Sequence, residues 1–214
     1  MKIISIVLMV AAMIEGKNIY STSSCNLMIT DEMQVRPENL MKKIEKFPKY
    51  FRFESEIRLN SNVGFPQFRV NQTPKYGLQN IFHVSTRDNA DSTCSSTDAG
   101  RLPSMFAYMD REGEFKYILV EFCQGNQLKD MYIKPEDINF NKQDWIKFKM
   151  EQSKQTGKTS IWINDIRILD VPFDQVYEYT NVNVWAASDL WQKQYGWPVA
   201  DANIRHLAMC ELSD

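Results

Sequence analysis

The last third of the chain reads DWIKFKMEQ (144–152), KTSIWINDIRILDV (158–171), NVNVWAASDLW (181–191) and NIRHLAMCEL (203–212). Apolar and polar residues alternate along these segments, which is typical of β-strands with one buried face and one wet face. Asn, Asp, Gly and Pro, the ordinary turn residues, lie between them. The end of the chain therefore predicts consecutive antiparallel strands, as in a β-sandwich or a barrel.

The same alternation extends upstream. YFRFESEIRLN (50–60) places Phe51 and Phe53 on one face and Arg52 and Glu54 on the other. Further strand patterns recur about every ten residues, at 79–86, 104–110, 115–123 and 129–133. Only RPENLMKKIEK (36–46) predicts a short helix, because its apolar residues recur at helical spacing after an early proline. The sequence predicts an all-β domain with at most one short helix.

The chain begins with a basic residue and a short apolar run. Lys2 precedes IISIVLMVAAMI (3–14), and Glu15 and Gly16 end the run. This layout predicts a secretory signal peptide over residues 1–16, with a second possible cut after Ala12. A membrane-spanning helix needs roughly 20 apolar residues, so no membrane insertion is predicted. We expect a secreted, extracellular protein in which residues 17–214 form one β-sandwich domain, with the segment 17–48 packing on it.

Composition restricts the class of partner. The chain is 43% hydrophobic and carries a formal net charge of −2, which is ordinary for a globular domain and excludes nucleic acid held by bulk electrostatics. Four cysteines in an oxidising compartment predict two disulfides, and three connectivities are possible. No Cys/His spacing typical of a metal site occurs. The cysteines are Cys25, Cys94, Cys123 and Cys210.

Several stretches resemble a known family. The chain is similar to animal extracellular domains of the concanavalin A-like lectin/laminin G type, in the group around the farnesoic-acid-methyltransferase-like domain. The resemblance covers roughly residues 50–212. It departs from the family pattern at Asp165, Leu190 and Ala202, and no Gly-rich loop able to hold a methyl donor is present. The matching stretches are NIFHVSTRDN (80–89), GRLPSMFAY (100–108), DWIKFKMEQ (144–152), SIWINDIRI (160–168), NVNVWAASDLW (181–191) and PVADANIRHL (198–207).

The resemblance implies a two-sheet antiparallel jelly-roll sandwich. In such a sandwich the first and last strands lie side by side, which implies a Cys25–Cys210 disulfide and hence Cys94–Cys123. Laminin-G-like domains often hold one calcium ion at a loop rim, so calcium is the one cofactor that the resemblance suggests. Its predicted donors lie in the polar loop 87–101, although D-x-D-x-D spacing is absent. They are Asp88, Asp91 and Asp98.

A loop rich in aromatic residues predicts the ligand site. WQKQYGWP (191–198) carries Trp191, Tyr195 and Trp197, and flat rings in a rigid loop stack against sugars or proteins. Trp191 alternatively caps the core. His83 and Arg87 lie in a family-matching stretch and are predicted to add polar contacts, with His83 alternatively a satisfied core or cleft histidine. The sequon at Asn71 predicts a surface loop and a glycosylation site, although Pro74 disfavours occupancy.

Catalytic motifs are missing from the sequence. The E-x-D-x-x-E run of glycosidases on this fold does not occur, and neither histidine adjoins a nucleophile elbow. Glu54 and Glu56 share one face of a strand, but charged residues alternate along all of it. We therefore predict no enzyme but a secreted recognition module that binds a glycan or an extracellular protein. The alternatives are a structural component of a matrix, coat or secretion, and a glycoside hydrolase or lyase on the same fold.

Overall fold

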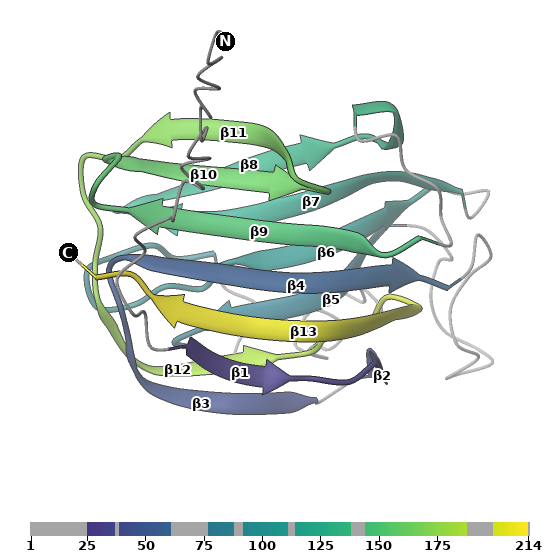
Figure 1. The fold of residues 1–214 in the computed structure, drawn as a ribbon, viewed down its shortest axis with the longest axis horizontal. Coiled ribbons are helices and arrows are strands. Elements are labelled where there is room, and N and C mark those ends of the chain that lie inside the picture. The colour runs from purple at the N-terminus through teal and green to yellow at the C-terminus, as the bar shows by residue number, and fades with distance from the viewer. Residues whose placement is uncertain are drawn as a thin grey trace, which may run out of the picture.

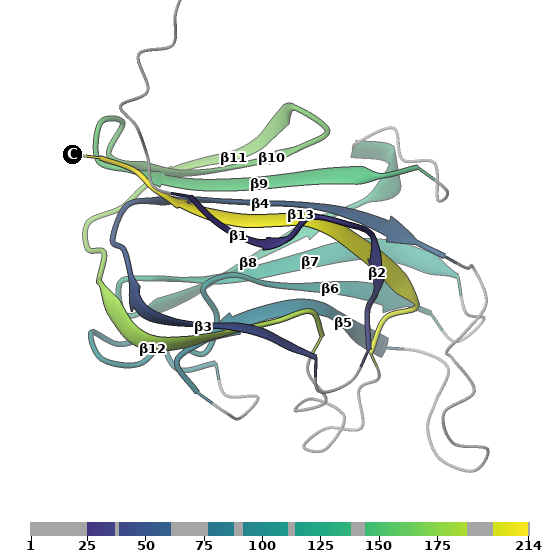
Figure 2. The same cartoon turned by 60° about the horizontal axis from the view of Figure 1, so that its bottom comes forward.

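The computed structural model describes residues 25–36, 39–60, 77–87, 92–110, 114–137, 144–187 and 199–213. They form two stacked antiparallel sheets, one in front of the other in Figure 1 and one above the other in Figure 2. The predicted all-β sandwich is confirmed. Within these ranges the helical structure is a 3₁₀ turn, η1 (Pro135–Asp137), and no helix is long and apolar enough to cross a bilayer. The predicted signal peptide lies outside the described residues.

The seven-stranded sheet joins the two ends of the described chain. Its strands, in spatial order, are β1 (Cys25–Ile29), β13 (Ala202–Glu211), β4 (Phe51–Leu59), β9 (Ile146–Ser153), β10 (Lys158–Ile163) and β11 (Ile166–Pro172), with β2 (Met33–Gln34) also paired to β13. Cys25 lies directly opposite Cys210 in the β1–β13 ladder. The predicted disulfide between them is confirmed, as is the predicted Cys94–Cys123 disulfide.

The six-stranded sheet packs against the first. Its order is β3 (Leu40–Phe47), β12 (Tyr179–Trp185), β5 (Gly77–Ser85), β6 (Ser104–Met109), β7 (Phe115–Gln124) and β8 (Gln127–Ile133). The chain changes sheets between β3 and β4 and again between β4 and β5. It also changes sheets between β2 and β3, between β8 and β9 and on either side of β12. These crossings are those of a jelly roll and confirm the predicted fold class.

Alternating side chains of both sheets fill the space between them. Phe53 on β4 and Phe148 on β9 meet Phe82 on β5, with ring centroids of Phe53 and Phe82 5.2 Å apart and those of Phe82 and Phe148 5.6 Å apart. All three rings are fully buried. Burial of such apolar surface is the main favourable term in folding. The intervening charged residues of β4 point outward, as its alternation predicted.

The predicted helix over residues 36–46 is wrong. Leu40–Phe47 forms β3, an edge strand paired with β12 from Phe47↔Tyr179 to Leu40↔Trp185. The helical spacing was misleading, because Leu40 is 38% exposed and only Ile44 and Phe47 enter the core. Backbone pairing to a neighbouring strand outweighs the weak helix propensity of so short a segment. The lysines of this segment suit an exposed edge, where charge discourages pairing with another chain.

The turn of the β10–β11 hairpin carries backbone strain that a substitution can test. Its two-residue turn, Asn164 and Asp165, has φ values of 49° and 65°, which for a residue other than glycine costs free energy. We expect Asp165→Gly to raise the free energy of unfolding by about 0.5–1 kcal/mol. Thermal unfolding followed by circular dichroism measures this as a higher Tm. The exposed Asp165 carboxylate lies 3.8 Å from Lys147 Nζ, a contact of little value in water.

Asn164→Gly is the matched control for that variant. The Asn164 side-chain oxygen accepts a hydrogen bond from the Lys147 backbone N–H at 2.9 Å. Glycine would relieve the same backbone strain but lose this bond, so we expect no net gain. A Tm increase at Asn164 equal to that at Asp165 would show that this hydrogen bond adds no stability, and no increase at Asp165 would contradict the predicted backbone strain.

Candidate binding face

The six-stranded sheet carries a row of polar side chains on its outer face. Strand pairing places five residues of neighbouring strands side by side, and directly paired residues project to the same face. Val84, Met105 and Val120, which alternate with three of them, lie in the core, so the row points away from it. The polar row consists of Trp185 (β12), His83 (β5), Ser104 (β6), Glu121 (β7) and Asp130 (β8).

The centre of the polar row is buried. His83 and Ser104 have no exposed surface, and Glu121 is 8% exposed. His83 Nε2 lies 3.0 Å from the Gly100 carbonyl oxygen. Burial lowers the pKa of His83 to about 3. The imidazole is therefore neutral at neutral pH, and its Nε2–H donates to that carbonyl.

A buried ion pair joins Glu121 of the polar row to Arg101. Arg101 Nη1 lies 2.5 Å from Glu121 Oε2, and both side chains are almost wholly buried. Burial raises the pKa of Glu121 to about 7, the Arg101 charge opposes that rise, and Asp130 adds to it. A pair of this kind is costly to break, because either partner alone is an uncompensated buried charge.

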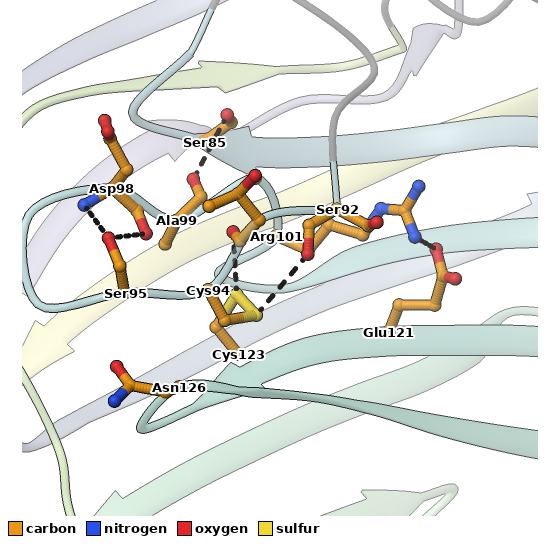
Figure 3. The surroundings of a disulfide bond; sticks show 12 residues. Ser85, Ser92, Cys94, Ser95, Asp98, Ala99, Arg101, Glu121, Cys123 and Asn126 are labelled. Atoms are coloured by element: carbon orange, nitrogen blue, oxygen red, sulfur yellow. Dashed lines mark hydrogen bonds and ion pairs between the residues drawn. A yellow bond between two sulfur atoms is a disulfide. The ribbon is translucent and has the colours of Figure 1, made fainter.

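The Cys94–Cys123 disulfide holds the segment that supplies Arg101. Figure 3 shows Cys123 and Glu121 on β7 with the segment 92–101 beside them. Backbone bonds fix the segment further, since Cys123 N–H donates to the Arg101 carbonyl and Leu102 N–H to the Val84 carbonyl, both at 2.8 Å. The polar loop predicted to carry binding chemistry is thus partly a buried support for the row.

Three tyrosines lie toward the other end of the same face. Tyr108 (β6) and Tyr117 (β7) are paired residues whose rings stack at 4.7 Å with a 4° angle between planes. Tyr132 (β8) meets Tyr117 edge-on at 5.2 Å and is 57% exposed. Burial raises the pKa of Tyr117, and the two neighbouring tyrosines add to the rise. Among these residues, the tyrosine group, Tyr108 and Tyr117 are separated from the polar row by the buried pair Phe106 and Leu119, whereas Tyr132 pairs with Leu119 and follows Asp130 on the same face of β8.

The described residues include two of the predicted ligand residues, His83 and Arg87. His83 lies on the outer face of the six-stranded sheet but is fully buried against Gly100. Arg87 Nη2 donates to the Asp98 carboxylate at 3.0 Å, so this predicted calcium donor already has a cationic partner. The described residues contain no group of three or more His, Cys, Asp or Glu side chains placed to hold a metal. Asp88 and Asp91 lie outside the described residues, and calcium stays a prediction.

The aromatic loop and the sequon also lie outside the described residues. This applies to Trp191, Tyr195, Trp197 and Asn71. The flanks of the loop are described. The chain leaves β12 through Ala187 and returns at Val199, which pairs in parallel with Asn80 of β5, while Ala200 N–H donates to the Asn80 carbonyl at 2.9 Å. Both flanks therefore adjoin the six-stranded sheet.

No hydrogen bond joins Ser104 to a neighbouring base among the described residues of the polar row. Ser104 Oγ has no hydrogen-bond partner among the described residues, so the neighbouring His83 does not activate it. Trp185 Nε1 is likewise buried without a partner in that part of the chain. These two groups, a hydroxyl and an indole N–H, are buried beneath this face without a protein partner among the described residues.

The acidic pair of β4 lies on the outer face of the other sheet. Glu56 Oε2 accepts hydrogen bonds from Arg205 at 2.6 and 2.7 Å, and Glu54 lies 3.7 Å from Arg52. Burial raises the pKa of Glu56, but the hydrogen bonds from Arg205 and His206 outweigh it and lower the pKa overall. Both carboxylates thus belong to an ion-paired ladder, which agrees with the solvated face that the alternation predicted.

Comparisons with known proteins give similarity only in fold. No family model and no curated protein matches the chain. Among solved structures, a pentraxin from Limulus polyphemus is 10% identical with a TM-score of 0.45, covering 86% of this chain and 75% of that one. A galectin from Caenorhabditis elegans is 9% identical with a TM-score of 0.39, covering 86% and 96%. An alginate lyase from Alteromonas is 9% identical with a TM-score of 0.40, covering 85% and 79%.

Proposed function

We propose that this protein is a secreted, non-catalytic recognition module that binds a glycan or an extracellular protein on the outer face of the six-stranded sheet. The observation that carries this proposal is the tyrosine group, in which Tyr132 is 57% exposed beside Tyr117. Tyrosine offers a flat apolar ring and a hydroxyl, and so both stacks and hydrogen-bonds. The exposed Asp130, two residues before Tyr132 on the same face of β8, adds a hydrogen-bond acceptor.

Secretion is supported by the sequence of residues 1–16 and by two disulfides, which persist in oxidising compartments. The resemblance to animal extracellular domains agrees with this. The aromatic loop is proposed as a neighbouring contact, because its flanks at Ala187 and Val199 adjoin the same sheet.

Tyr132→Ala tests this function. We expect at least a tenfold loss of affinity for the bound ligand, because an aromatic side chain at the centre of a contact typically contributes more than 1 kcal/mol. The ligand is first found on a glycan array and by capture of extracellular proteins, and affinity is then measured by titration. The side chain is mostly exposed, so the variant should keep the melting temperature of the parent.

Trp162→Ala is the matched control. Trp162 is an aromatic residue on the outer face of the seven-stranded sheet, with Lys149 Nζ 3.8 Å from its ring centroid. We expect its loss to leave affinity unchanged. Equal affinities of Tyr132→Ala and the parent protein, with every ligand found, would refute the proposed site.

A further inference from the structure

We infer that the tyrosine group takes a neutral glycan rather than an acidic one or a protein surface. This inference rests on the proposed function, since it names the ligand class of the same face. It is carried by the charges around the three tyrosines and by the small size of the exposed ring surface.

Two lysines next to the tyrosine group in the described part of the chain lie beside carboxylates. Lys116, beside Tyr117, lies 2.8 Å from carboxylate oxygens of both Asp110 and Glu114. Lys134, two residues after Tyr132, lies 4.0 Å from Glu136. A sulfated or uronic-acid chain is held by cations that can turn to its anionic groups. Lys116 turns to another anion only by leaving both carboxylates, whereas the exposed contact of Lys134 with Glu136 holds Lys134 weakly.

The exposed charge on this part of the face is negative. Asp130 is exposed on β8, and its directly paired neighbour Glu121 is neutralised by Arg101. Lys129, also on β8, keeps its positive charge, because its hydrogen-bond acceptor at 2.8 Å is the neutral side-chain oxygen of Gln127. Carboxylates still outnumber lysines in the described surroundings of the tyrosine group, which disfavours a polyanion and offers acceptors to hydroxyl groups. The carboxylates are Asp110, Glu114, Asp130 and Glu136, and the lysines are Lys116, Lys129 and Lys134.

The exposed ring surface suits sugar rings better than a protein. A standard protein interface buries about 800 Å² on each partner. Here one tyrosine is more than half exposed, and Tyr108 and Tyr117 cover each other by stacking. The Tyr132 ring can lie against the C–H face of a sugar. Sugar hydroxyls can then donate to Asp130 and exchange hydrogen bonds with the phenol hydroxyls.

The experiment compares neutral and acidic glycans directly. The full chain is titrated with neutral oligosaccharides of glucose, galactose, mannose and N-acetylglucosamine, and with alginate, hyaluronan and heparin, at 50 and 300 mM NaCl. We expect Tyr132-dependent binding to a neutral glycan, with less than a twofold change in Kd between the two salt concentrations. Binding only to acidic glycans, weakened severalfold by salt, would overturn the inference.

Two variants at Asp130 and Glu136 sharpen the result. Asp130→Asn is expected to weaken binding of the neutral glycan about threefold to tenfold, because a charged acceptor is replaced by a weaker one. Glu136→Gln removes a nearby exposed carboxylate on η1 and should leave binding unchanged. Equal effects of the two variants would contradict direct contact at Asp130.

The inference and the proposed function fail differently. Tyr132-dependent binding to an extracellular protein alone would overturn the neutral-glycan assignment and keep the binding face. Binding of any ligand without dependence on Tyr132 would overturn both.

Discussion

Replacing Arg101 with methionine is expected to lower the free energy of unfolding by about 3–5 kcal/mol at pH 8. The substitution keeps a long apolar side chain but removes the cation that faces Glu121 at 2.5 Å. The Glu121 carboxyl is 8% exposed and would lose its ionic partner in a buried place. Breaking a buried pair on one side costs this much because a single charge is left without compensation. Urea unfolding monitored by tryptophan fluorescence measures the change.

The effect should depend on pH in a definite direction. The pKa of Glu121 in the folded chain is raised to about 7 by burial, from 4.5 when unfolded. Such a group stabilises the fold fully below pH 4.5, and this contribution is lost as pH rises through 7. Removal of Arg101 raises the folded pKa further, so Arg101→Met should be more destabilised at pH 8 than at pH 5. An equal loss of unfolding free energy at pH 5 and pH 8 would contradict a raised pKa of the buried Glu121 carboxyl.

The double variant Arg101→Met with Glu121→Leu supplies the control. Replacing both partners by apolar side chains of similar volume is often neutral or stabilising. We expect it to recover most of the stability lost by Arg101→Met. A double variant as unstable as the sum of the two single variants would show that the two side chains act independently.

Removing the Cys25–Cys210 disulfide is expected to have an effect of similar size. These cysteines are 185 residues apart in sequence, so the bond closes nearly the whole described chain. Loop-closure entropy in the unfolded state gives about 5 kcal/mol for a loop of this length and about 4 kcal/mol for the 29-residue loop of Cys94–Cys123. We expect the Cys25→Ser/Cys210→Ser variant to unfold at a correspondingly lower urea concentration.

The Cys94→Ser/Cys123→Ser variant is the matched comparison. It should lose slightly less stability by the loop-length argument. It should also loosen the segment 92–101, seen in Figure 3 beside Glu121, and faster hydrogen exchange at the Cys123 amide would report this. A larger effect of Cys25/Cys210 removal on exchange at Cys123 than of Cys94/Cys123 removal would contradict the local role.

Most strands could be predicted because each shows an alternation of apolar and polar residues within its own sequence. The alternation of Phe51, Arg52, Phe53 and Glu54 reports one buried face and one wet face, and the structure agrees. The helix prediction for residues 36–46 was wrong because three apolar residues fit helical spacing. The pairing of this segment with β12, more than 130 residues later in the chain, decided its conformation. Propensity is a local quantity and tertiary pairing overrides it.

The candidate site was less predictable. Tyr108, Tyr117 and Tyr132 each look like an ordinary strand tyrosine, and no spacing along the chain links them. Arg101 and Glu121 are 20 residues apart, in segments that could have faced different directions. A signal did exist, because the three tyrosines and Glu121 occupy outward positions of their strands. It was not enough without knowing which strands are neighbours.

The sequence by itself determined the class of fold and the number of disulfides. Its resemblance to laminin-G-like domains implied how the cysteines pair. Alternation with a period of two assigns each residue to a face of its own strand, whatever surrounds that strand. Only the tertiary structure decided which faces and which residues meet. Strand order and register depend on pairings between distant segments, and a shift of one residue would move every side chain to the opposite face. The polar row exists because five neighbouring strands, β12 and β5 to β8, are held in register, and the tyrosine group exists because β6 to β8 are.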